Sequence, residues 1–282
     1  MLAALLALAS SMSWGLSDFL GGLQSRRHPV LAVMLLSQGL ALGLLAIAAL
    51  AGAPTDHDTE ATLYAAISGS VGICALAAFY RALSIGTMSV VAPISATGTV
   101  IPVIVGLASG ERPSAIQVTG IALAAFGVVL AGREAPAAGE EERRGGRAAI
   151  VLALIAAIGF GSFFAAVDHA EETADATWVL LSARTPAVAL LIVAALITRP
   201  ALPRGRSVIA PIAAIGVFDL LANLLFIIAA GKGLLSVVGT LGSLYPAVTV
   251  ILARYVLHER LSRVQNVGVV TTLAGVVALA AG

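Results

Sequence analysis

Long apolar runs separated by short charged stretches dominate the sequence. Eight runs contain no Asp, Glu, Lys or Arg, and they cover 1–17, 28–55, 61–80, 82–110, 113–132, 148–167, 233–253 and 264–282. A helix of about 20 apolar residues crosses the hydrocarbon core of a bilayer, so each run is about long enough for one crossing. Two more apolar runs, 176–198 and 207–231, each enclose a single charge, Arg184 and Asp219 respectively.

The pattern therefore predicts an all-α membrane protein with ten transmembrane helices. Helices are the expected spanning form because the backbone must satisfy its own hydrogen bonds in lipid. The predicted helices cover 2–22, 30–50, 62–83, 89–109, 114–132, 148–168, 176–197, 207–230, 234–257 and 263–281.

Composition narrows the class of protein further. Of the 282 residues, 59% are hydrophobic and 11% are charged, against about 25% charged in a typical soluble domain. This balance excludes a soluble globular domain and indicates a multi-pass protein whose partner is the lipid bilayer of the cell membrane (the plasma or inner membrane). The net charge is +1 and the basic residues are scattered, which argues against nucleic acid as a partner.

The chain contains an internal repeat. The segment 111–120 resembles 259–268 at an offset of 148 residues, and a weaker match at an offset of 147 pairs 86–91 with 233–238. The predicted units are 1–132, a charged linker at 133–147, and 148–282. Each unit holds five helices, and an odd number places the second unit upside down in the membrane, as in many secondary transporters.

Each copy of the repeat contains a capping box. Ser114 with Gln117, and Ser262 with Gln265, have the spacing at which a hydroxyl and an amide cap the start of a helix. The motif is mainly a structural turn in this interpretation, and a functional role for its glutamate, Glu111 or Glu259, is the alternative.

The basic residues lie mostly in loops after odd-numbered helices, whereas loops after even-numbered helices hold only Arg112 and Lys232. By the positive-inside rule, the loops after odd-numbered helices face the cytoplasm and both termini face outside.

Charged residues within apolar runs are candidate site residues because they are costly at membrane depth. Arg184 and Asp219 lie at matching distances from the loop that joins their two antiparallel helices, so their side chains are expected to meet. Asn223 lies four residues after Asp219, on the same helix face. A structural ion pair and a substrate or proton site are both open interpretations.

Other polar or aromatic residues complete the candidate pathway. Asp18 and Trp14 lie one turn apart near the end of the first helix, and Gln38 lies inside the second. The fourth and ninth helices are repeat mates that are expected to flank a central pathway. They carry prolines and small polar residues, together with one tyrosine, namely Pro93, Ser95, Thr97, Thr99, Pro102, Thr240, Ser243, Tyr245 and Pro246.

These residues occur in motifs that resemble the EamA domain transporters of the drug/metabolite transporter superfamily. The resemblance extends over nearly the whole chain, and it rests on Trp14-Gly15, Tyr80-Arg81-Ala82-Leu83, Val90-Val91-Ala92-Pro93, Tyr245-Pro246 and the two Glu-Arg-x-Ser-x-x-Gln-x-x-Gly turns. It implies a ten-helix inverted-repeat carrier that moves small metabolites or drugs, often outward. Arg184 matches an arginine common in the seventh helix of the family, while Gln38 stands at the equivalent position of the first repeat. Members often have cytoplasmic termini, which conflicts with the charge distribution.

The sequence as a whole favours a secondary transporter over an enzyme. The expected activity is export of a small metabolite, an amino acid or a drug by alternating access at the repeat interface, with proton coupling as an option. No metal-ligand spacing or phosphate-binding loop is visible, so neither a metal nor a cofactor is expected. An intramembrane enzyme and a non-transporting membrane assembly protein are the alternatives, and the chain is compatible with a homodimer.

Overall fold

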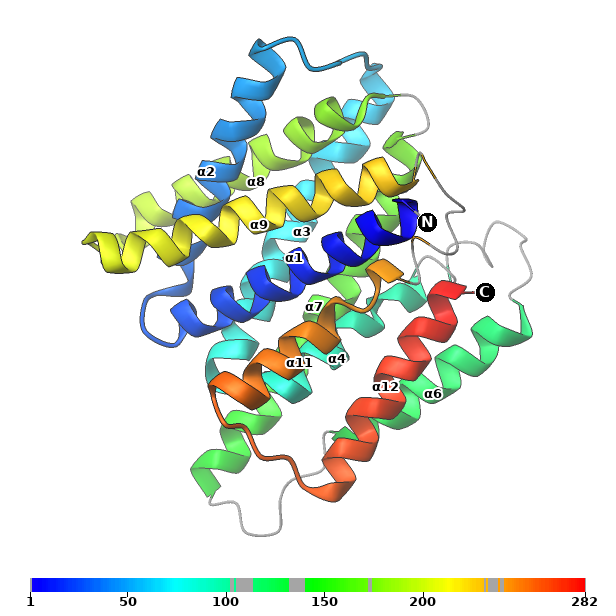
Figure 1. Cartoon of the computed structure of the whole chain (residues 1–282). Helices are drawn as coiled ribbons and strands as arrows, with labels where there is room; N and C mark the ends of the chain where they lie inside the picture. Colours follow the sequence, from blue (N-terminus) through cyan, green and yellow to red (C-terminus); the bar gives the residue numbers. More distant parts are fainter. Residues whose placement is uncertain are drawn as a thin grey trace.

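The computed structural model of the chain describes residues 2–101, 104, 114–131, 140–171, 174–230, 232, 238 and 241–281. Within these ranges the chain forms helices joined by short connections, and none of these residues lies in a strand. Figure 1 shows the helices packed into one bundle. The predicted all-α class is therefore confirmed for the described part of the chain.

The helix boundaries follow the apolar runs closely. The helices are α1 (Leu2–Ser25), α2 (Val30–Leu50), α3 (Thr59–Ile85), α4 (Met88–Ala96), the 3₁₀ turn η1 (Thr97–Thr99), α6 (Ala115–Ala131), α7 (Glu140–Glu171), α8 (Ala176–Thr198), α9 (Arg206–Ala230), α11 (Tyr245–Val256) and α12 (Arg263–Ala281). Helix α3 begins at Thr59 rather than at residue 62, because the carboxylate of Asp58 accepts a hydrogen bond from the backbone N–H of Ala61 at 2.7 Å.

Seven of the described helices are long and apolar enough to cross a membrane, which makes this a multi-pass membrane protein. They are α1, α2, α3, α7, α8, α9 and α12. Helices α6 and α11 are apolar but shorter. The predicted spans 89–109 and 234–257 are described only in part, so ten crossings remain a prediction. Residues 140–147 of the predicted linker form the start of α7, and 132–139 lie outside the described residues.

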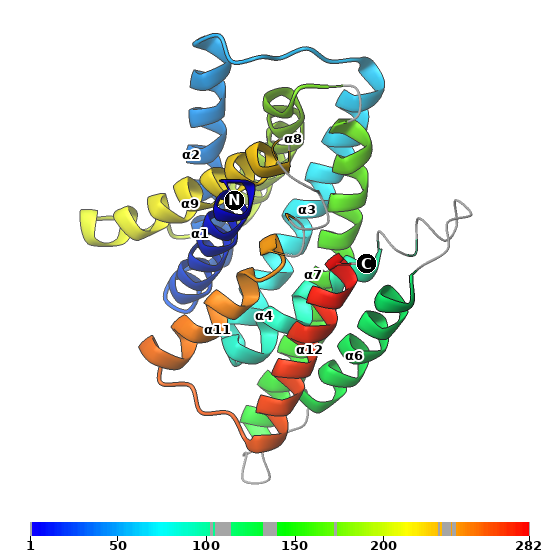
Figure 2. The same ribbon diagram turned by 45° about the vertical axis from the view of Figure 1, so that its right-hand side comes forward.

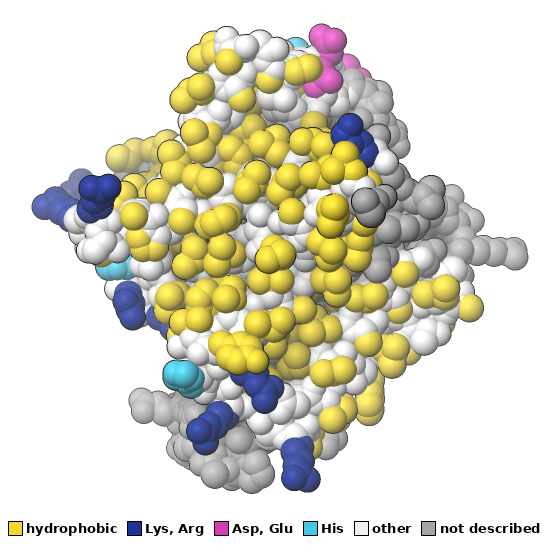
Figure 3. Space-filling model, in the orientation of Figure 1, with side chains coloured by type: hydrophobic (Ala, Val, Ile, Leu, Met, Phe, Trp, Pro, Cys, Tyr) yellow, Lys and Arg dark blue, Asp and Glu magenta, His cyan; other side chains and the backbone are white. Residues whose placement is uncertain are grey.

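The outer surface of the bundle is apolar around its middle. Large hydrophobic side chains within the helices, such as Ile158, Val217 and Val270, are 60%, 43% and 66% exposed. In Figure 3 hydrophobic side chains cover the centre of the face, and most of the Lys and Arg side chains lie along its left and lower edges. Exposure on this scale is unusual for a soluble monomer and is expected where side chains face lipid.

Helix contacts recur when the two halves of the chain are exchanged. Helix α1 packs against α9 and the start of α11, and its repeat mate α7 packs against α3 and η1. Likewise α3 packs against α8, and α9 packs against α2. Two further contacts join repeat mates directly, namely α2 with α8 and α6 with α12. Helix α4 also packs against α11, which lies in the predicted span equivalent to its own.

Glycines at helix crossings show the same recurrence at the level of single residues. A Cβ at Gly69 of α3 would overlap the backbone carbonyl of Ala183 in α8, and a Cβ at Gly216 of α9 would overlap the carbonyl of Ser37 in α2. Gly216 follows Gly69 by 147 residues and Ala183 follows Ser37 by 146. The crossing of α9 with α2 therefore corresponds to the crossing of α3 with α8 when the two halves are exchanged. At both crossings only glycine lets the two backbones approach so closely.

A second pair of crossings surrounds α1 and α7. Gly15 of α1 lies against the carbonyl of Tyr245, at the start of α11, whereas Gly161 of α7 lies against the carbonyl of Gly98 in η1. Gly161 and Tyr245 follow Gly15 and Gly98 by 146 and 147 residues. The contacts of α1 with α11 and of α7 with η1 therefore also correspond to each other when the two halves are exchanged.

Helices α6 and α12 pack side by side along the edge of the bundle, as both ribbon views show (Figures 1 and 2). Gly120 faces Gly275 and Leu279, while Gly127 faces Gly268 and Thr272. The residue number rises along one helix as it falls along the other, so the two helices are antiparallel. Close packing through small residues is typical of membrane helices.

Candidate functional site

Arg184 of α8 links three helices inside the bundle. Its Nη2 donates to Asp219 Oδ2 of α9 at 2.6 Å, and its Nη1 donates to Gln38 Oε1 of α2 at 2.5 Å. The side chains of Arg184 and Asp219 are 11% and 23% exposed. Among the basic residues whose side chains the structure describes, Arg184 alone is not exposed. A partly buried guanidinium with two charge-assisted or polar partners holds a fixed orientation.

The third guanidinium nitrogen of Arg184 is also buried. Its Nε has no hydrogen-bond partner among the described residues. A buried donor without a partner is unfavourable, so this nitrogen marks a point where the site is not fully satisfied by the protein itself.

Gln38 and Arg184 occupy equivalent positions in the two halves, at an offset of 146 residues. Their direct hydrogen bond brings the two repeat mates into contact with each other.

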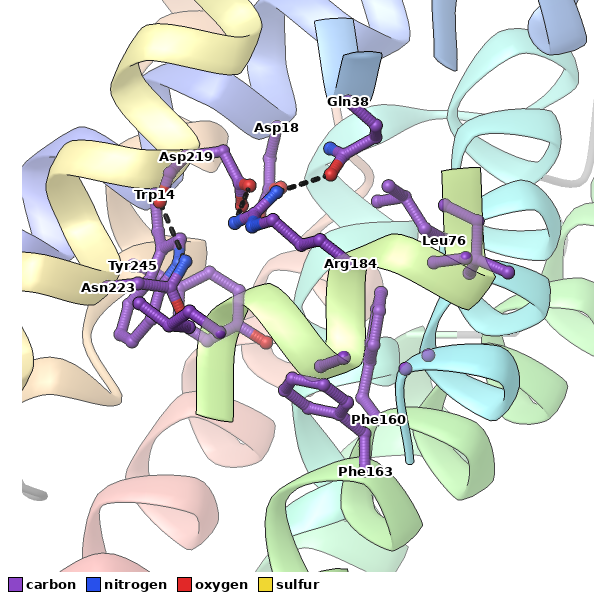
Figure 4. Close-up of a pocket in the computed structure, with 16 residues that line it drawn as sticks. Trp14, Asp18, Gln38, Leu76, Phe160, Phe163, Arg184, Asp219, Asn223 and Tyr245 are labelled. Atoms are coloured by element: carbon purple, nitrogen blue, oxygen red, sulfur yellow. Dashed lines mark hydrogen bonds and ion pairs between the residues drawn. The ribbon is translucent and has the colours of Figure 1, made fainter. Parts of the chain in front are cut away.

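A cavity of about 140 Å³ adjoins this contact, with room for several water molecules. All seven residues that the sequence singled out for the pathway line it, and Figure 4 shows them around one space. These are Trp14, Asp18, Gln38, Arg184, Asp219, Asn223 and Tyr245. Their shared location is a structural observation, whereas their role in binding or transport remains a prediction.

One side of the cavity is polar. Trp14 and Asp18 of α1 lie one turn apart on the same helix face, and Asp219 and Asn223 of α9 have the same spacing. These four residues are called the polar wall below. The amide Nδ2 of Asn223 donates to the backbone carbonyl of Asp219 at 2.7 Å, which fixes its orientation along α9.

Aromatic packing holds Trp14 in place within the polar wall. Its ring lies 5.6 Å from the ring of Phe226 in α9 and 6.2 Å from that of Tyr245, which it meets edge-on at 67°. Such tilted and edge-to-face pairs are favourable geometries for aromatic side chains.

The opposite side of the cavity is apolar, and none of its residues was among the candidates named from the sequence. It consists of Gly72 and Leu76 of α3 with Phe160 and Phe163 of α7, which are called the apolar wall below. The repeat contains a signal that identifies three of the four. Phe160, Gly72 and Leu76 are the equivalents of Trp14, Asp219 and Asn223, at offsets of 146 or 147.

The remaining lining residues are small or aliphatic, namely Gly69, Ile73, Leu180, Ala183 and Ala187. No described residue of α4 lines the cavity, although the fourth helix was expected to flank the pathway. Instead the hydroxyl of Ser95 donates to the carbonyls of Val91 and Ala92 within its own helix. Pro102 and Thr240 lie outside the described residues.

Both capping boxes form at the starts of α6 and α12. Gln117 N donates to Ser114 Oγ at 3.1 Å, and Ser114 N donates to Gln117 Oε1 at 2.9 Å. The corresponding distances for Ser262 and Gln265 are 3.2 and 3.0 Å. These four residues therefore act as helix caps and lie apart from the cavity lining.

Glu259, in the turn before α12, caps a different helix. Its carboxylate accepts hydrogen bonds from the backbone N–H groups of Met88 and Ser89 at 2.9 Å and from Ser89 Oγ at 2.7 Å. Arg26 forms an ion pair with it at 3.3 Å and also donates to the carbonyl of Gly86. Glu259 thus satisfies the first turn of α4, which supports the structural interpretation of this glutamate. Glu111 lies outside the described residues.

Within the described ranges, His, Cys, Asp and Glu do not gather in groups of three or more. The candidate site is therefore built from one ion pair, one further carboxylate, two amides and a set of aromatic and aliphatic side chains.

Comparison with known proteins connects this geometry to a family. The model of the EamA-like transporter family matches residues 1–133 and 147–281, which is nearly the whole chain. Among curated proteins, no sequence matches. One solved structure, a crystal structure, is 15% identical with a TM-score of 0.63, and the match covers 98% of this chain and 95% of the other. At that identity the likeness concerns the fold alone.

Proposed function

Because the chain belongs to the EamA-like transporter family, within the drug/metabolite transporter superfamily, we propose that it is a secondary transporter. It moves a small metabolite, an amino acid or a drug across the cell membrane by alternating access between its two halves. The observation that carries the proposal is the cavity at the contact between the halves, which is lined by a partly buried ion pair and a second carboxylate within the apolar helices. Ionisable groups there are costly and mark substrate or ion pathways.

The helix contacts support an inverted repeat. Helices α6 and α12 are antiparallel, and exchanging the halves carries their contacts onto each other: Gly120 with Leu279 becomes Gly268 with Ala131. A two-fold axis that exchanges two antiparallel helices runs perpendicular to both. If these helices cross the membrane, that axis lies in the membrane plane, which is the arrangement of inverted-topology transporters.

The charge distribution supports one orientation. Exposed arginines such as Arg26, Arg204 and Arg263 follow odd-numbered predicted helices, whereas Asp56 and Glu60 belong to a connection on the other side. By the positive-inside rule the arginine-rich end faces the cytoplasm. Export is the direction proposed, with a proton exchanged through Asp18 or Asp219.

Substitution of Asp219 tests the proposal. We expect Asp219→Asn to reach the membrane, because the new amide keeps the shape of the side chain, but to lose transport. Untargeted metabolite profiles of cells that overproduce the wild-type protein, Asp219→Asn or the exposed control Asp56→Asn would first identify the transported compound. Counter-flow of that compound would then be measured in proteoliposomes. Full counter-flow by Asp219→Asn, with Asp56→Asn unchanged, would contradict the proposed role of this site.

A further inference from the structure

Among the described residues that line the cavity, two carboxyl groups stand against one guanidinium, so the charges do not balance when both carboxyl groups are ionised. Asp219 is paired with Arg184 at 2.6 Å, so these two groups neutralise each other. Asp18 is the second carboxylate of the lining, and it forms no hydrogen bond or ion pair with any described residue. A carboxylate enclosed by protein without a counter-ion is unfavourable. The cavity therefore favours a positive group beside Asp18.

The surroundings of Asp18 are aromatic. Trp14 lies one turn earlier on the same face of α1, and Tyr245 packs edge-on against Trp14 with ring centroids 6.2 Å apart. An indole is the strongest natural partner for a cation above its ring face. A carboxylate next to an indole favours binding of an ammonium group, because the carboxylate supplies the opposite charge and the indole supplies a polarisable surface.

The apolar wall faces this charged region across the cavity. In Figure 4 Phe160, Phe163 and Leu76 lie on the side away from Trp14, Asn223 and Tyr245. The described lining residues of α3 and α7 carry no charge. A ligand that fills the cavity therefore has one charged part and one apolar part.

Arg184 does not offer an equivalent site for an anion. Both of its terminal nitrogens already donate, to Gln38 and to Asp219. Its unpartnered Nε is buried, so a ligand cannot reach that nitrogen without moving the surrounding side chains. Each terminal nitrogen keeps a second N–H, but Asp219 already compensates the charge of the guanidinium, so an anion gains less beside Arg184 than a cation gains beside Asp18.

We propose that the cavity binds a small amphipathic organic cation. Its positive group lies beside Asp18 and Trp14, and its apolar part lies against Phe160, Phe163 and Leu76. This inference rests on the proposed function, because it takes the cavity to be the transport site and assigns the class of substrate.

Binding in the cavity can be followed by the fluorescence of Trp14. The chain has two tryptophans, of which Trp14 lines the cavity. The other, Trp178, stacks on His57 near the start of α8, with ring centroids 3.8 Å apart. In a Trp178→Phe background, tryptophan fluorescence of the purified protein in detergent reports on the cavity alone.

Four probes separate charge from apolar contact. Benzyltrimethylammonium has both features, tetramethylammonium has only the charge, phenylacetate has the opposite charge, and phenylalanine is a zwitterion. We expect benzyltrimethylammonium to change the fluorescence of Trp14 saturably and to bind about tenfold or more tightly than each of the others.

Variants on the two walls should act differently. Asp18→Asn should weaken benzyltrimethylammonium about tenfold or more, while Asp56→Asn, an exposed carboxylate outside the cavity, should leave it unchanged. Leu76→Ala should weaken benzyltrimethylammonium and leave tetramethylammonium unaffected. If Asp18→Asn folds poorly, the Leu76→Ala comparison still tests the proposal. Equal binding by Asp18→Asn, equal loss of both cations in Leu76→Ala, or tighter binding of phenylacetate or phenylalanine would overturn it.

Failure of this inference differs from failure of the proposed function. If proteoliposomes show counter-flow of anions or zwitterions only, the protein is a transporter with another substrate class. If the cations bind as expected but no compound shows counter-flow, the site assignment stands and the transport proposal fails.

Discussion

The polar and apolar walls of the cavity are built from equivalent helices of the two halves but carry different chemistry. Helices α1 and α9 form the polar wall, and their repeat mates α7 and α3 form the apolar wall. The equivalent positions are Trp14 and Phe160, Asp219 and Gly72, and Asn223 and Leu76. The side chains that face the cavity thus differ between positions that the sequence repeat pairs with each other.

The helix crossings behind the walls, called the framework below, keep the same residue type in both halves. Gly69 and Gly216 sit at equivalent crossings, and each lies against a backbone carbonyl of its neighbour. The crossing distance is fixed by the absence of a side chain, so neither half tolerates a change there. Lining positions, in contrast, vary freely as long as the cavity stays open. The following experiments test whether the two kinds of position respond as this comparison requires.

The largest effect is expected at the ion pair that Asp219 of the polar wall forms with Arg184. Arg184→Gln leaves the carboxylate of Asp219 inside the bundle without its cation, and removing one partner of a buried pair costs about 3–5 kcal/mol. Asp219→Asn should cost less, because Arg184 keeps its bond to Gln38. The free energy of unfolding would be measured in detergent micelles.

The double variant completes this test. Arg184→Gln with Asp219→Asn removes both charges and should recover much of the stability lost in Arg184→Gln alone, since neutral replacement of a buried pair is often tolerated. Transport should remain absent. If the losses in unfolding free energy of the two single variants simply add, Arg184 and Asp219 do not stabilise each other, and the ion pair contributes nothing to the stability of the fold.

A smaller but equal effect is expected at the two crossing glycines. Gly69→Ala and Gly216→Ala each place a methyl group against a backbone carbonyl, and such overpacking costs about 1–3 kcal/mol. Gly43→Ala in α2, where nothing lies within 4 Å, is the matched control and should gain up to about 1 kcal/mol from helix propensity. Unequal losses at Gly69 and Gly216 would show that the framework has diverged along with the walls.

The sequence identified the polar wall for a physical reason. A charge within an apolar run is costly in lipid, so Arg184 and Asp219 stand out without any knowledge of the fold. Gln38 was found through the repeat, because it is equivalent to Arg184. The same logic predicted helix positions well, since apolar runs and charged connections determine where a chain crosses a membrane.

The residues of the apolar wall could not be predicted in this way, because they carry no charge. Phe160 lines the cavity, whereas Ile158, two residues earlier in the same helix, is 60% exposed toward the lipid side. In α7 apolar side chains face both lipid and cavity, so hydrophobicity does not tell the two faces apart. Comparing the halves position by position identifies Phe160, because its mate Trp14 belongs to a recognisable motif.

Glu259 provides a third and intermediate prediction. Glu259→Gln keeps the size of the side chain but removes the charge that accepts three hydrogen bonds at the start of α4, and we expect a loss of about 2 kcal/mol. Arg26→Gln should cost less than about 1 kcal/mol, because the Arg26 side chain is 30% exposed. Thermal unfolding of the purified proteins measures both. A larger loss for Arg26→Gln would mean that the ion pair, rather than the helix cap, is the main role of Glu259.

The smallest effect is expected at the two capping boxes, and it is the most direct comparison of the halves. Ser114→Ala and Ser262→Ala each remove one acceptor for a free backbone N–H, which costs about 1 kcal/mol. Their hydrogen-bond lengths agree within 0.1 Å between the halves, and neither serine touches the cavity. The two unfolding free energies should therefore fall by the same amount, with substrate affinity unchanged. A change in substrate affinity for either variant would mean that the start of α6 or α12 belongs to the transport pathway. That result would contradict the distinction between packing positions and cavity-lining positions.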